Sequence, residues 1–164
     1  MLPPMSKAVP SSQDRVLEVF GETVIIRRDP AGHLDAAVIE EVVPPGVGAP
    51  LHRHSREDEI SYVLEGTLTV QQGTRIEQAG PGGCIHKPKG VFHAFWNSGS
   101  EPVRFLEVIA PGGFEHFFEE LATLATHRNS LDLVALAGLA RGYGVEFDLA
   151  SVDTLLARHR LSPG

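Results

Sequence analysis

Short apolar runs separated by Gly and Pro fill the chain from about Val16 to Ile109. The runs have the length of strands, and turn residues such as Pro44-Pro45-Gly46 stand between them. This spacing predicts an all-β sandwich or barrel rather than alternating strands and helices. Around Gly66 the pattern predicts a tight hairpin between two strands. The predicted strands are Val24–Ile26, Ala36–Val43, Ile60–Leu64, Thr67–Gln71 and Val103–Ile109.

The hydrophobic period changes from that of strands to that of helices after Gly113. Apolar residues then recur at spacings of three and four, as on one face of a helix. A second helix is predicted from about Leu131 to Arg141, ending at Gly142, and a third with Ser151 as its N-cap. We expect the helices to pack on the outside of the barrel, with a lid over the barrel mouth as the alternative. The first helical stripe is Phe114, Phe117, Phe118, Leu121 and Leu124.

These patterns predict a flexible tail over residues 1–15, a barrel over 16–110 and a helical appendage over 111–164. The opening run is rich in Pro and Ser and lacks the apolar stretch of a signal peptide. No segment approaches the roughly 20 continuous apolar residues that span a bilayer. Cys84 is the single cysteine, which excludes an intramolecular disulfide. We therefore expect a soluble, cytoplasmic protein without a membrane partner.

The charge balance argues against a nucleic-acid partner. The 164 residues include 14 Lys and Arg against 21 Asp and Glu, a formal net charge of -7. The basic residues are scattered apart from the pairs Arg27-Arg28 and Lys87/Lys89. Phosphate binding requires a clustered basic surface, which this sequence does not contain.

Two spaced motifs carry the candidate chemistry. The segment from Gly46 to Gly66 reads Gly-x5-His-x-His-x4-Glu-x6-Gly, and the segment from Gly82 to Asn97 reads Gly-x5-Pro-x-Gly-x2-His-x3-Asn. Residues two apart on a strand point to the same face, so His52 and His54 can aim at one point. Glu59 can return an anionic oxygen to that point from the next stretch, and the fold can bring in His93 from a distant strand. Three imidazoles and a carboxylate suit one divalent transition metal ion: Fe, Ni, Cu, Mn or Zn.

The two segments resemble the two conserved motifs of the cupin family, with a short linker between them. The resemblance implies a cupin-type double-stranded β-helix, or jelly-roll barrel, with metal on His52, His54, Glu59 and His93. The family spacing selects Glu59 over Glu57 and Asp58, which we then expect to be solvated. Cupins commonly pair through their sheets, so the resemblance also implies a homodimer.

Strand parity predicts which residues surround the metal. Ser61 and Val63 share the parity of Glu59, and Phe95 shares the parity of His93, so these three are predicted pocket residues. Many relatives have a bulky residue at the position of Ser61, which predicts a roomier or more polar pocket here. His86 is a weak candidate for a supporting role near the metal. Other residues are expected to have structural or packing roles: His33, His116, His127, His159, Asn97, Gly66, Gly90, Pro88, Trp96, Tyr62 and Phe92.

A small cupin with a helical tail looks like the bacterial quercetin dioxygenase-like group. That resemblance implies a metal-dependent oxidoreductase, dioxygenase-like, that acts on a small oxygenated organic substrate. Glu59 would then also be catalytic, taking a proton from a substrate hydroxyl while it holds the metal. One alternative is a redox-neutral isomerase, cyclase or decarboxylase that uses the metal as a Lewis acid. Another is a non-catalytic protein that binds a small molecule.

Overall fold

The computed structural model describes residues 14–27, 34–126 and 132–159. The predicted N-terminal tail up to residue 13, the turn at 29–32, and His33 and His127 lie outside these ranges, as does the side chain of His159. Within the described residues, no helix combines the length and the hydrophobicity needed to cross a membrane.

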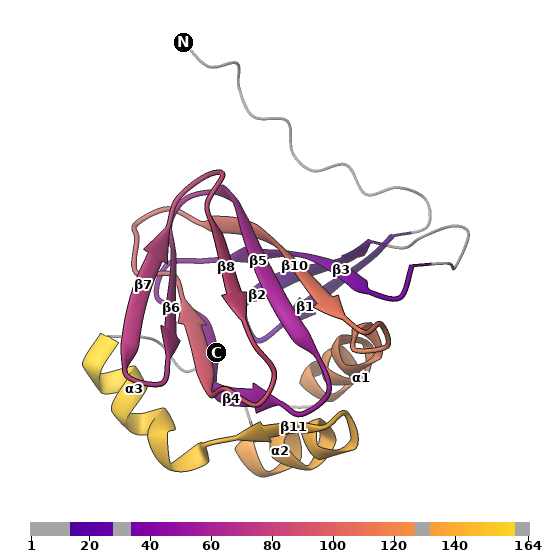
Figure 1. Cartoon of the computed structure of the whole chain (residues 1–164). Helices are drawn as coiled ribbons and strands as arrows, with labels where there is room; N and C mark the ends of the chain where they lie inside the picture. The colour runs from indigo at the N-terminus through magenta and orange to yellow at the C-terminus, as the bar shows by residue number, and fades with distance from the viewer. Residues whose placement is uncertain (1–13, 28–33, 127–131, 160–164) are drawn as a thin grey trace.

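Two antiparallel β-sheets form the body of the molecule (Figure 1). The first sheet has the order β1 (Arg15–Val19), β2 (Glu22–Arg27), β3 (Ala37–Val43), β10 (Val103–Ala110), β5 (Asp58–Glu65) and β8 (Cys84–Lys87). The second has the order β11 (Val145–Phe147), β4 (Gly48–His54), β9 (His93–Trp96), β6 (Leu68–Gln72) and β7 (Arg75–Ala79). The predicted, mainly β jelly-roll fold with C-terminal helices is confirmed.

The turn at Gly66 connects the two sheets instead of closing a hairpin. Its flanking strands, β5 and β6, belong to different sheets and are not paired with each other. Gly66 has a φ of 74°, and a Cβ there would lie 2.8 Å from the carbonyl oxygen of Pro102. The predicted hairpin was therefore wrong, because hydrophobic spacing does not show which sheet a strand joins.

The helices follow the second motif, as the change of period predicts. They are α1 (Glu115–Thr126), α2 (Leu133–Gly142) and α3 (Val152–His159), with a short 3-10 turn at Leu149–Ser151. The N-terminus of α2 is capped by Asp132, whose side chain accepts hydrogen bonds from the N–H groups of Val134 and Ala135. The third helix begins at Val152, directly after Ser151.

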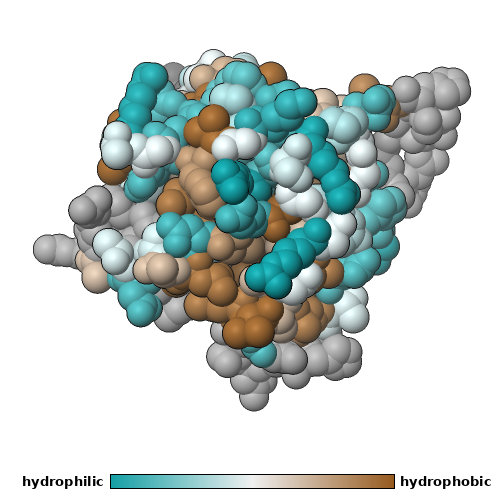
Figure 2. Space-filling view, turned by 60° about the horizontal axis from the view of Figure 1, so that its bottom comes forward, coloured by the Kyte–Doolittle hydropathy of each residue, from teal (hydrophilic) through white to brown (hydrophobic). Residues whose placement is uncertain are grey.

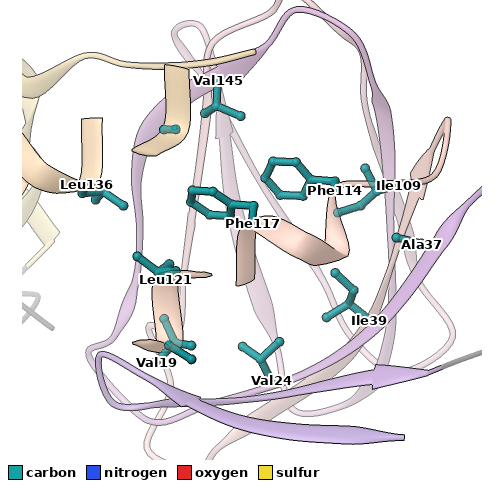
Figure 3. Packing of buried hydrophobic residues seen from close by; sticks show 12 residues of the cluster. Val19, Val24, Ala37, Ile39, Ile109, Phe114, Phe117, Leu121, Leu136 and Val145 are labelled. Atoms are coloured by element: carbon teal, nitrogen blue, oxygen red, sulfur yellow. The ribbon is translucent and has the colours of Figure 1, made fainter. Parts of the chain in front are cut away.

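The aromatic stripe of α1 belongs to a hydrophobic core shared with the first sheet (Figure 3). Phe117 is 5% exposed and packs in one cluster with Val24 and Ile39 of the sheet. The packing role predicted for this stripe is confirmed. In addition, α1 and α2 supply side chains to this core, and β11 pairs with β4 of the second sheet.

A band of polar residues divides this core from a second hydrophobic cluster formed around Phe95 and Phe105. Register places the band on the inner face of the first sheet. Glu107 pairs with Ile39 on one side and with Ser61 on the other, and Glu59 pairs with Lys87. We call this set the polar band: Glu22, Glu41, Glu107, Ser61, Glu59 and Lys87.

Candidate metal centre and its cavity

Four buried side chains from three strands meet at one point. His52 and His54 come from β4, Glu59 from β5 and His93 from β9. One ligand atom from each lies within 4.8 Å of the ligand atoms of all the others. The structure thus brings together the four residues that the motifs single out.

Backbone carbonyls orient two of the imidazole rings. The Nδ1 atom of His52 lies 2.7 Å from the carbonyl oxygen of Pro50, and that of His93 lies 3.0 Å from the carbonyl oxygen of Val91. A carbonyl can only accept, so each Nδ1 carries the proton and donates it. Each Nε2 is left with a lone pair, which is the form that binds a metal.

A carboxylate orients the third ring. Glu57 is 6% exposed, and its Oε2 lies 3.3 Å from Nδ1 of His54. The expectation that Glu57 is solvated was therefore wrong. Asp58 is exposed, and it accepts a hydrogen bond from the backbone N–H of Lys89. In the sequence, the spacing of three residues between His54 and Glu57 was the available indication of this contact. The sequence alone did not show that the chain turns back between them.

Several ligand atoms are buried without a hydrogen-bond partner: Nε2 of His54, Nε2 of His93 and Oε2 of Glu59. Nε2 of His93 lies 2.8 Å from Oε2 of Glu59, and Nε2 of His54 lies 3.3 Å from Oε1 of Glu59. With the Nδ1 atom of His93 protonated, the close pair consists of two lone-pair donors that face each other. A cation between them relieves that repulsion, so these residues fit a metal ion.

Electrostatics favours the protonation states that a metal requires. Burial and the neighbouring imidazoles hold the pKa of His52 well below its ordinary value, and burial also lowers the pKa of His93. Burial alone would raise the pKa of Glu59, but the positive charge of Lys87 opposes it, and that pKa lies well below its usual range. Neutral imidazoles and an ionised carboxylate are the ligand forms of divalent transition metals.

Lys87 is a buried cation beside this centre that the motifs do not indicate. It is 2% exposed, and its Nζ lies 2.7 Å from Oε2 of Glu107 and 3.6 Å from Oε2 of Glu59. Glu107 also accepts a hydrogen bond of 2.8 Å from the hydroxyl of Ser61. In the sequence, strand alternation was the available indication that Lys87 is buried. Lys87 lies two residues after the buried Ile85 and therefore faces the same side of the strand.

A cavity of about 360 Å³ opens onto the metal centre. Its polar wall includes His52, His54 and Glu59 together with Glu22, Glu41, Lys87 and Glu107 of the polar band. Its apolar wall comes largely from the C-terminal elements: Phe114, Phe117, Phe118, Leu121, Leu136, Val145 and Phe147. Figure 2, turned to bring the side of β11 and α2 forward, shows hydrophobic residues gathered in its lower half.

Two C-terminal aromatic rings contact the histidines directly. The ring of Phe114 packs edge-on at 4.6 Å between centroids from His54, and that of Phe147 lies 5.3 Å from His52. Register explains the second contact, because Phe147 of β11 pairs with His52 of β4. The C-terminal segment therefore forms part of the candidate site.

Comparison with known protein families agrees with the fold described above. Residues 39–109 match the family model described as "Cupin domain". This segment is a cupin domain. No curated protein matches the chain in sequence.

Solved structures share the cupin fold over about three fifths of the chain. KdgF from a Halomonas species is 19% identical, with a TM-score of 0.53, and the match covers 62% of this chain and 90% of that one. A sugar phosphate isomerase of the cupin superfamily from Silicibacter pomeroyi is 26% identical, with a TM-score of 0.53 and coverage of 61% and 71%. Oxalate decarboxylase from Bacillus subtilis is 23% identical, with a TM-score of 0.54 and coverage of 60% and 28%.

The three predicted pocket residues, Phe95, Ser61 and Val63, differ in whether they border the cavity. Phe95 is buried and lines the cavity. Ser61 and Val63 are fully buried inside the barrel but do not border the cavity. Instead of leaving open space beside the metal centre, Ser61 is hydrogen-bonded to Glu107. The cavity thus supports Phe95 as a pocket residue more directly than Ser61 or Val63.

The remaining candidates are placed away from the centre. His86 is exposed, with its Nε2 3.6 Å from Asp58, so it does not support the ligands. His116 is also exposed and lies beside Glu119 on α1. Gly66 and Gly90 adopt positive φ angles, and the side-chain amide of Asn97 donates to the carbonyl oxygen of Val43. These last three have the structural roles expected of them.

Proposed function

We propose that this cupin is a metal-dependent enzyme, dioxygenase-like in its reaction, that acts on a small oxygenated organic substrate. The observation that carries the proposal is the set of unpartnered ligand atoms of His54, Glu59 and the adjacent His93, of which His54 and Glu59 line a largely apolar cavity. A structural metal site is closed by protein ligands, whereas a catalytic site keeps access for substrate. The cavity beside these atoms provides that access.

The protein residues would divide the work as follows. His52, His54, Glu59 and His93 would hold one divalent transition metal, which supplies Lewis acidity and redox capacity when bound. Phe114 and Phe147 pack against the imidazoles and limit the access of water. Glu59 would hold the proton of a substrate hydroxyl at its carboxylate. Lys87 stabilises the ionised form of Glu59. This favours the role of Glu59 as a metal ligand over its role as the holder of a substrate proton.

A redox-neutral reaction is the second candidate. Its support is the similarity to a structure described as a sugar phosphate isomerase, at 26% identity over 61% of this chain. In that case the metal would act only as a Lewis acid, and the reaction would proceed without dioxygen. The same four ligands serve both candidates, so the reaction class must come from measurement.

Metal content tests the proposal first. The protein is purified without added metal or chelator and subjected to elemental analysis beside His52→Ala, His93→Ala and the exposed control His116→Ala. We expect near-stoichiometric metal in the wild type and the control, and its loss in both ligand variants. Equal trace metal in all four proteins would refute the metal centre.

Oxygen consumption then separates the reaction classes. The metal-loaded protein is screened with phenolic and enediol substrates in an oxygen electrode. Consumption that depends on His52 and His93 supports the dioxygenase. Turnover that persists under nitrogen, or with zinc alone, supports the redox-neutral alternative instead.

A further inference from the structure

Two acidic side chains of the polar band line the cavity on strands that supply no metal ligand. Glu41 of β3 is 2% exposed, and Glu22 of β2 is half-buried. Register places them together, because Glu41 pairs with Val24 and Glu22 lies two residues before Val24 on the same face. Both border the same cavity as His52 and Glu59.

Glu41 lacks the cation that a buried carboxylate needs. Its Oε2 is buried without a hydrogen-bond partner. Lys87 contacts Glu107 and Glu59 instead. Among the described residues, neither Glu41 nor Glu22 has a Lys or Arg nitrogen within ion-pairing distance. Burial of an ionised carboxylate without a nearby cation is strongly unfavourable. A positively charged group of a ligand would therefore be stabilised beside this pair.

Neighbouring negative charges also disfavour the ionised form of Glu41. Burial and the charge of Glu22 raise the pKa of Glu41 well above its ordinary value, and Glu107 and Glu59 act in the same direction while Lys87 opposes them. Burial raises the pKa of Glu22 to about 8. These shifts favour the protonated form of both carboxyls, and a bound cation would favour their ionised form instead.

We propose that Glu22 and Glu41 form a subsite for a protonated amine of the substrate. Hard metal ions require six or more oxygen ligands, and the surrounding wall, with Val19, Phe20 and Phe95, offers mainly apolar groups. An alkylammonium needs only a few acceptors, and its carbon body can lie against that apolar wall. The inference rests on the proposed function for the metal end of the substrate, and it narrows the substrate class to amphipathic amines.

A matched ligand pair tests the subsite. Binding of 2-phenylethylamine and of 2-phenylethanol is measured by isothermal titration calorimetry at pH 8, on metal-free and on zinc-loaded protein. We expect the amine to bind at least tenfold more tightly than the alcohol. Glu41→Gln should remove this preference and Glu22→Gln should reduce it. Glu40→Gln should retain it, because Glu40 points to the opposite face and pairs with Arg27 and Arg104.

Three outcomes would overturn the subsite: equal affinity for the alcohol, an amine preference that survives Glu41→Gln, or no binding of the amine. Melting curves of each variant show that it is folded, and the melting temperature should change little, because Gln is an uncharged side chain of nearly the same volume as a protonated Glu. The metal-free measurement separates this test from the proposed function. An amine preference in the metal-free protein supports the subsite even if the metal proposal fails. Metal binding without an amine preference would leave the proposed function standing and refute the subsite.

Discussion

Substitution of Lys87 by Met removes the one buried cation of the polar band among the described residues while largely keeping its volume. Its Nζ lies 2.7 Å from Glu107 and 3.6 Å from Glu59. At an effective dielectric constant of about 20, unit charges at these separations attract by about 6 and about 5 kcal/mol. Desolvation of the ammonium opposes this attraction, and loss of one partner of a buried pair costs about 3–5 kcal/mol. We expect Lys87→Met to lower the free energy of unfolding by that amount at pH 8.

The loss should be smaller at pH 5.5. Burial raises the pKa of Glu107 to about 7, so the folded state keeps a proton there that the unfolded state releases above its pKa of 4.5. The contribution of a raised carboxyl pKa to stability is present at low pH and is lost as pH rises through 7. Without Lys87 the pKa of Glu107 rises further, and protonation at pH 5.5 removes most of the uncompensated charge.

Urea denaturation of chelator-treated protein at both pH values measures these differences. Lys89→Met is the matched control, because Lys89 is exposed and its substitution should change stability by less than about 0.5 kcal/mol. In the double variant Lys87→Met/Glu107→Gln we expect recovery of about 1–3 kcal/mol relative to Lys87→Met. A loss below about 1 kcal/mol at pH 8, or strict additivity in the double variant, would show that the charges of this band are not coupled as described.

Three further predictions concern the ligand support, the C-terminal wall and assembly. Glu57→Gln should weaken metal affinity by about 10- to 100-fold in competition titrations, while Asp58→Asn should not, and equal effects would contradict the role of Glu57 beside His54. Phe114→Ala should destabilise the protein by about 3–5 kcal/mol in thermal or urea unfolding, because Phe114 is 5% exposed, and a near-neutral result would show that α1 is loosely held. We also propose a homodimer through the outer face of the first sheet, where Ile60 and Tyr62 are 40% and 43% exposed. Light scattering should give twice the chain mass for the wild type and a monomer for Tyr62→Lys, and a monomeric wild type would exclude this dimer.

The sequence was most informative where spacing and chemistry coincide. The two motifs selected His52, His54, Glu59 and His93, and the fold brings their ligand atoms within 4.8 Å of one another. The stripe beginning at Phe114 predicted a helix with a buried face, because its spacing matches the helical period.

Features that depend on strand pairing could not be predicted in the same way. Glu41 and Lys87 are charged residues at inward positions, and polarity alone suggests that such residues face solvent. β11 has only three residues, Val145–Phe147, too few for a recognisable alternation. Its contact with His52 follows from a register that links positions far apart in the chain.

The pairing of β11 with β4 also protects the strand that carries two of the ligands. Without β11, β4 would be the outermost strand of its sheet, since its other neighbour is β9. Outermost strands present free N–H and C=O groups that other polypeptides can pair with, which promotes aggregation. A fragment that ends after α1 would retain every motif residue yet expose His52 and His54 on such a strand. The barrel is therefore unsuited to transplantation as a minimal module without its C-terminal segment.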